Sequence, residues 1–117
     1  MDRALAWSSD KSTRLAVDWM DYTMGPSLQI LSGYLDEAIE SNYIPYESTL
    51  GQYITAADAA EWYANLRAWY EEVGHFWTTT APFYLHSANP TLGFVDLRRF
   101  EDHPDPIDRW VFLLEDL

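Results

Sequence analysis

Residues 55–74 read TAADAAEWYANLRAWYEEVG, and this stretch predicts the clearest helix of the chain. Thr55 and Asp58 have the spacing of a capping box in which aspartate replaces the usual glutamate. Gly74 has the backbone freedom that helix ends favour, so the helix is expected to stop there. Apolar side chains recur at helical steps along one side and are expected to face the core: Ala59, Trp62, Leu66, Trp69 and Val73.

Two more helices are predicted before this one. Residues 12–24 (STRLAVDWMDYTM) place Leu15 and Trp19 on one side at helical spacing, after a Ser12 or Thr13 cap. Gly25 can close that helix and Pro26 can open the next, over residues 26–42. The inner face of this second helix is expected to carry Leu28, Leu31, Leu35 and Ile39. Pro45 ends the pattern, so residues 43–52 are predicted to be a connector.

The last third of the chain is ambiguous. Residues 75–103 contain segments that suit either short helices or alternating strands. Asp105 and Pro106 can start a final helix, whose apolar positions are Ile107, Trp110, Val111, Leu114 and Leu117. A strand over residues 110–114 competes with that helix. The predicted fold is therefore mainly α, a compact bundle of five or six helices in a single acidic domain (residues 1–117). A small β-hairpin within residues 75–103 is the alternative.

Composition points to a globular protein. The chain has 117 residues, 48% of them hydrophobic, which is enough to fill one core. It has no cysteine, so it can form neither a disulfide nor a thiolate metal site. No apolar run reaches the ~18 residues that a membrane span needs. A soluble, cytoplasmic protein is expected, located in the host cytoplasm if a phage encodes it.

Charge is the most unusual feature of the sequence. The formal net charge is −12, and residues 15–66 hold eight acids without a single lysine or arginine. Residues 101–117 form a second acidic block, with six acids and one base, Arg109. Direct binding to nucleic acid or to an anionic membrane requires lysine and arginine, so neither is expected. A charged partner should be cationic.

No catalytic motif supports an enzyme. The chain lacks the HExxH, GxSxG, phosphate-loop and dinucleotide-binding patterns, and its three histidines are far apart in sequence. The best catalytic or metal-binding candidate is the cluster Glu101, Asp102, His103, Asp105 and Asp108. Capping of the last helix explains this cluster more simply. We therefore expect no enzymatic activity, no catalytic residue, no metal and no cofactor.

The acidic block of residues 15–66 supplies the predicted binding site. An unpaired carboxylate is too costly to bury, so these groups must face water or a cation. Tyrosine is a side chain that interfaces favour, and several tyrosines lie in or beside the block. The predicted partner-binding residues are Asp36, Glu37, Glu40, Tyr43, Tyr46, Glu47, Asp58 and Glu61.

Three functions compete. The leading hypothesis is a non-enzymatic acidic inhibitor that binds a cationic, nucleic-acid-binding surface of a partner protein. It would act as a nucleic-acid mimic, in the manner of phage anti-defence (anti-CRISPR or anti-restriction) proteins. Immunity proteins that neutralise basic nuclease toxins follow the same physical logic. A general protein-protein adaptor is the second hypothesis, and a small enzyme that uses His103 is the third.

Overall fold

The structure is a computed structural model that describes residues 5–106, 108, 109 and 111–114. Contacts divide the chain into two compact units, Met1–Phe76 and Trp77–Leu117. Within the described residues, the first unit has four α-helices and a small parallel sheet, and the second has a β-hairpin and a short 3-10 helix. The prediction of a mainly α bundle of five or six helices is therefore wrong. The expectation of a single domain concerns cooperative folding and stays a prediction.

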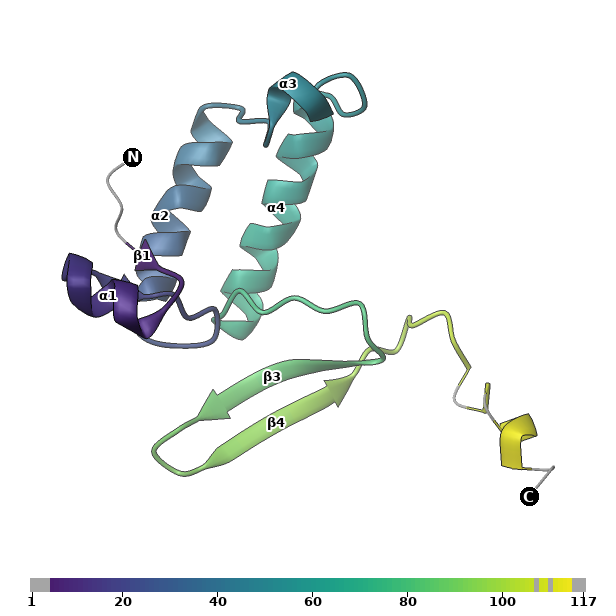
Figure 1. Cartoon of the computed structure of the whole chain (residues 1–117). Helices are drawn as coiled ribbons and strands as arrows, with labels where there is room; N and C mark the ends of the chain where they lie inside the picture. The colour runs from purple at the N-terminus through teal and green to yellow at the C-terminus, as the bar shows by residue number, and fades with distance from the viewer. Residues whose placement is uncertain (1–4, 107, 110, 115–117) are drawn as a thin grey trace. The chain divides into compact units, whose positions relative to one another are not determined.

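Helices α2 (Ser27–Glu40) and α4 (Ala56–Val73) are the frame of the first unit. They run side by side in opposite directions (Figure 1), and residues of the two helices contact each other. Both match their predicted ranges closely. Residues 41–55 form a connector between the carboxyl end of α2 and the amino end of α4. This connector contains helix α3 (Glu47–Leu50).

The predicted caps of α4 are confirmed. The Thr55 hydroxyl accepts the Asp58 N–H at 3.2 Å, and the Asp58 carboxylate accepts the Thr55 N–H at 2.7 Å. Donation by the Thr55 hydroxyl and N–H lowers the pKa of the Asp58 carboxyl below its ordinary value. We expect the contribution of this capping box to the free energy of unfolding to be complete at neutral pH. It should be lost as the pH falls below about 4 and Asp58 becomes protonated. At the other end, Gly74 takes the left-handed conformation (φ 78°) that closes the helix.

The predicted helix over residues 12–24 is wrong beyond residue 15, and the expected cap at Ser12 or Thr13 is wrong because the N-cap is Ser8. Helix α1 (Ser9–Leu15) ends at Ala16, which has left-handed backbone angles (φ 51°). The chain then forms strand β2 (Asp18–Trp19), which pairs in parallel with β1 (Leu5–Ala6). This pairing joins residues 13 positions apart and satisfies backbone groups that a longer helix would have bonded internally. Helical periodicity cannot reveal such a contact.

The hydrophobic core of the first unit is small. Among the described residues of the chain, only three hydrophobic side chains are buried: Ala6, Leu35 and Ala59. Trp62, predicted to face inward, is more than half exposed, whereas Leu66, Trp69 and Val73 are half-buried. Beyond the end of α4, the ring of Phe76 stacks on Tyr70 with a centroid separation of 4.4 Å. Much aromatic surface is therefore left to solvent.

The second unit contains the hairpin that competed with helices for residues 75–103. Strands β3 (Phe83–Asn89) and β4 (Phe94–Arg99) pair antiparallel across a turn that includes Gly93, at φ 62°. Further along, Val111–Leu114 forms the 3-10 helix η1, so these four residues belong neither to an α-helix nor to a strand. The other predicted positions of the final helix, Ile107, Trp110 and Leu117, lie outside the described residues.

Candidate protein-binding surface

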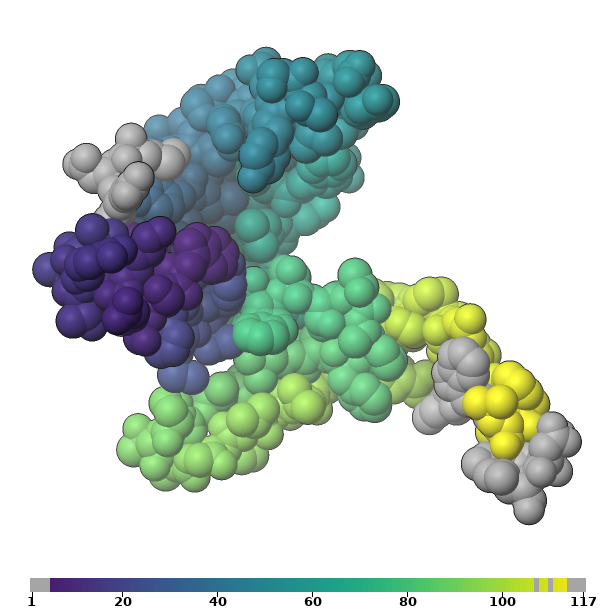
Figure 2. Space-filling model, in the orientation of Figure 1, coloured from purple at the N-terminus to yellow at the C-terminus, as the bar shows by residue number. Residues whose placement is uncertain are grey.

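The fold brings most of the predicted site residues to one end of the α2–α4 pair. Glu37 and Glu40 lie in the last turn of α2, Glu47 begins α3, and Asp58 and Glu61 lie in the first two turns of α4. With a rise of 1.5 Å per residue, each of these positions lies within about 9 Å of the connector, measured along the helix axis. In the space-filling view, the connector closes this end of the pair (Figure 2).

One predicted carboxylate is neutralised. The Arg67 guanidinium forms an ion pair with Asp36 and also donates to the hydroxyl and carbonyl of Ser32, at 2.8 and 3.2 Å. Arg67 is the first base after the acidic block and returns to it from α4. Asp36 therefore belongs to the packing of α2 on α4. Among the residues that the structure describes, no other acid of the predicted site forms an ion pair.

Glu37 and Glu40 occupy an unfavourable position. The carboxyl end of a helix carries partial negative charge, and an acid there costs about 0.3–1 kcal/mol, whereas a base would be stabilising. The last turn of α2 holds these two glutamates and no base. By contrast, the first turns of α3 and α4 favour Glu47 and Asp58. Helix stability therefore accounts for Glu47 and Asp58, but not for Glu37 and Glu40 in the last turn of α2, nor for Glu71 and Glu72 in the last turn of α4.

Exposed aromatic side chains accompany these carboxylates. Tyr43, Tyr46 and Tyr53 come from the connector and Trp62 from α4, and each is more than half exposed. Together they form what we call the acidic–aromatic end: Glu37, Glu40, Tyr43, Tyr46, Glu47, Tyr53, Asp58, Glu61 and Trp62. Tyrosine and tryptophan are enriched at protein interfaces. The combination of a flat apolar surface with unpaired charge is typical of a surface that another protein covers.

Tyr63 is a neighbour of Tyr43, one of the residues of this surface. It is half-buried on α4. Burial raises the pKa of its phenol, and the neighbouring Tyr43 raises it further. Its hydroxyl therefore stays neutral at physiological pH and adds no charge next to the carboxylates.

Tyr46 has a strained backbone. Its φ is 49°, in the left-handed region that costs a residue with a bulky side chain about 1–2 kcal/mol. Its side chain recovers little of that cost by burial, because it is 79% exposed. It also occupies the N-cap of α3 without making a side-chain cap bond. A strained and exposed aromatic residue is a candidate for function.

Tyr46→Asn should stabilise the fold and weaken partner binding. Asparagine tolerates left-handed angles better than tyrosine does, so the free energy of unfolding should rise by about 1 kcal/mol in urea denaturation. Tyr53→Asn is the matched control: Tyr53 is 77% exposed, but it does not have a positive φ. A stability gain of equal size in both variants would contradict the assignment of strain to Tyr46.

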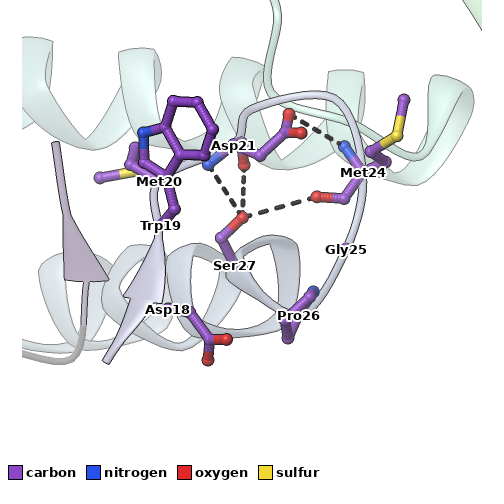
Figure 3. Close-up of a pocket in the computed structure, with 8 residues that line it drawn as sticks. All are labelled: Asp18, Trp19, Met20, Asp21, Met24, Gly25, Pro26 and Ser27. Atoms are coloured by element: carbon purple, nitrogen blue, oxygen red, sulfur yellow. Dashed lines mark hydrogen bonds between the residues drawn. The ribbon is translucent and has the colours of Figure 1, made fainter. Parts of the chain in front are cut away.

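Two acids of the block lie at the other end of α2. Asp18 and Asp21 line a cavity of about 250 Å³ between β2 and α2, together with Trp19, Met20, Met24, Gly25, Pro26 and Ser27 (Figure 3). The buried Ser27 hydroxyl donates to the Asp21 carbonyl at 2.7 Å and accepts the Asp21 N–H at 3.1 Å. These bonds hold the turn before α2.

One oxygen of the Asp21 carboxylate, Oδ1, accepts three hydrogen bonds within this turn. Burial acts to raise its pKa, but hydrogen bonds from the Thr23 hydroxyl, the Thr23 N–H and the Met24 N–H outweigh burial, and the pKa is lowered. Asp21 and Ser27, two of the polar residues that line the cavity, are thus used by the turn itself. We assign it a structural role.

The cluster around His103 is also held by local bonds. Asp105 forms an ion pair with Arg109, and its N–H donates to Nδ1 of His103 at 3.2 Å. His75, far from this cluster in sequence, is buried with its ring against Trp69. Over the described part of the chain, no group of three or more histidine, cysteine or acidic side chains is placed to hold a metal ion.

The chain matches no protein family, no curated protein and no solved structure. None of the helices that the structure describes is both long and apolar enough to cross a bilayer. The functional argument therefore rests on the geometry of the acidic–aromatic end.

Proposed function

We propose that this chain is a non-enzymatic binding protein whose acidic–aromatic end covers a cationic surface of a partner protein. The observation that carries the proposal is the coincidence of two unusual features on one end of the α2–α4 pair. Glutamates stand where the helix dipole disfavours them, and four aromatic side chains beside them remain exposed. Neither feature helps the isolated chain to fold.

The two kinds of side chain have different tasks in such a complex. Several unpaired carboxylates within a short span create a negative field that steers a positively charged partner and speeds its capture. Aromatic side chains that become desolvated at an interface supply most of the binding free energy, and this slows dissociation. Surfaces that bind nucleic-acid phosphates are rich in lysine and arginine, so they have the charge that complements this end.

A capture experiment tests the proposal. Cell lysate is first passed over heparin, and the retained basic proteins are offered to the immobilised chain at about 50 mM and about 300 mM NaCl. We expect a defined partner to bind at the lower salt and to be largely released at the higher one, because salt screens charges over ~8–10 Å. Duplex DNA added in excess should displace the chain from the same partner.

The competition result separates the possible forms of this function. Displacement by DNA supports a mimic that occupies the nucleic-acid site of its partner. Capture that is insensitive to both salt and DNA would contradict the proposal and favour an adaptor that binds through aromatic side chains alone.

A further inference from the structure

Arg67 joins the two helices that carry most of the acidic–aromatic end. Its guanidinium extends from α4 to α2, where Nη1 donates to the Ser32 hydroxyl at 2.8 Å and Nη2 to the Ser32 carbonyl at 3.2 Å. Nη2 also forms the ion pair with Asp36, one helical turn further along α2. One planar group thus binds three acceptors on two successive turns of the neighbouring helix.

These bonds can form together in only one register of the helix pair. Ser32 and Asp36 are four residues apart, so they lie one above the other on the same side of α2. A slip of α2 by one turn, about 5.4 Å, would change the residues that Arg67 meets. In one direction Leu28 would replace Asp36, and the ion pair would be lost. In the other, Glu40 would replace Ser32, and Arg67 would neutralise an acid of the acidic–aromatic end.

Apolar packing alone specifies this register weakly. Leu35 is the buried hydrophobic side chain of α2, and Ala59 is that of α4. Hydrophobic attraction is not directional, so a core this small discriminates little between neighbouring registers. Hydrogen bonds and ion pairs depend on position, and selection of one register is their best-attested use between helices. The Arg67 side chain is 21% exposed and that of Asp36 60%, so the pair contributes more to placement than to stability.

We propose that Arg67 is a positioning residue that fixes the register of α2 against α4 and so holds the carboxylates of both helices close together. Glu37 and Glu40 lie one and four residues beyond Asp36, and Glu61 lies six residues before Arg67. Along the helix axes these separations are about 1.5, 6 and 9 Å, so all three acids lie within two turns of the bonds. The inference rests on the proposed function, because it concerns the arrangement of the same binding site.

Arg67→Met distinguishes positioning from simple charge attraction by the sign of its effect. The variant loses a base, so by charge alone it should bind a cationic partner more tightly. If Arg67 positions the acids, the variant should instead bind about 5- to 20-fold more weakly, and its affinity should depend less on salt, because the carboxylates no longer act together. Biolayer interferometry against the captured partner measures both effects, at a temperature at which circular dichroism shows the variant to be folded.

Lys11→Met is the matched control for the binding measurement. It removes the same charge from α1, at an exposed position outside the helix pair. It should bind the partner as tightly as the wild type or slightly more tightly, with the same salt dependence. Equal effects of the two variants, or tighter binding by Arg67→Met, would overturn the proposal.

Spin labels measure the register without a partner. The chain has no cysteine, so Gln29→Cys on α2 and Ala60→Cys on α4 provide two exposed positions for labelling. Double electron–electron resonance should give one narrow distance distribution in this chain and a broader or shifted one when Arg67→Met is added. Ser32→Ala removes one acceptor without a change in charge and should have a smaller effect in the same direction. An unchanged distribution with Arg67→Met would overturn the proposal.

The two measurements distinguish failure of this inference from failure of the proposed function. A distance distribution that broadens with Arg67→Met, in a chain that captures no partner, would support the role of Arg67 in register and contradict the proposed function. A captured partner that binds Arg67→Met as tightly as the wild type would support the proposed function and overturn the role of Arg67.

Discussion

Replacement of Glu37, Glu40 and Glu47 by glutamine is expected to weaken partner binding about 10- to 100-fold at low salt. Each exposed charge pair contributes up to about 1 kcal/mol, so three pairs account for this range. The affinity of the variant should also depend less on salt than that of the wild type. Biolayer interferometry against the captured partner, over a series of NaCl concentrations, measures both effects.

A matched variant distinguishes the effect of charge at the acidic–aromatic end from the effect of the net charge of the chain. Asp10→Asn, Glu71→Gln and Glu72→Gln change the net charge by the same amount but lie on α1 and at the far end of α4. This control should bind within about threefold of the wild type. Intact binding by the variant of Glu37, Glu40 and Glu47 would contradict their assignment to the binding site. Equal losses of affinity in both variants would contradict it as well.

Stability provides an internal check on the same variant. Glu37 and Glu40 lie at the carboxyl end of α2, where negative charge is unfavourable, so their neutralisation should raise the free energy of unfolding slightly. Lost binding together with equal or higher stability would mark these residues as functional. Lost binding together with unfolding would not mark these residues as functional.

Leu35→Ala is expected to have the largest effect on stability. Leu35 is 5% exposed on α2 and is one of the few buried hydrophobic side chains that the structure describes. Truncation of a buried leucine costs about 2–5 kcal/mol, a large part of the stability of a small domain. The midpoint of thermal unfolding, followed by circular dichroism, should fall by about 10–20 °C.

Ile39→Ala is the control for this prediction. Ile39 lies one turn further along α2 and is 39% exposed, so its truncation should cost well under half as much. Similar losses for the two variants would contradict the packing of α2 against α4 that the structure shows.

The sequence predicted the elements whose signals are local. Thr55, Asp58 and Gly74 define the ends of α4 through bonds within a few residues, and α2 follows a regular apolar spacing between Pro26 and Pro45. Helix α1 was predicted too long because pairing of β1 with β2 is a contact between distant segments. In residues 94–99 apolar and polar side chains alternate, but so short a segment is compatible with the periodicity of either a helix or a strand.

The same distinction applies to the candidate site. Charged side chains cannot be buried alone, so the exposure of Glu37, Glu40 and Glu47 follows from their chemistry. Trp62 was placed inside because it fits the helical spacing of the core. Its exposure depends on which face of α4 meets α2, and the sequence does not carry that information. Likewise, the ion pair between Asp36 and Arg67 joins residues 31 positions apart.

The central claim is that five carboxylates of the acidic block converge into one anionic surface: Glu37, Glu40, Glu47, Asp58 and Glu61. An NMR titration of the ¹⁵N-labelled chain with a short lysine peptide measures this directly. We expect backbone amide shifts to change most at Glu37, Glu40, Glu47 and Glu61, with little change at Glu71 and Glu72. Shifts distributed evenly over all exposed acids of the chain would contradict the claim.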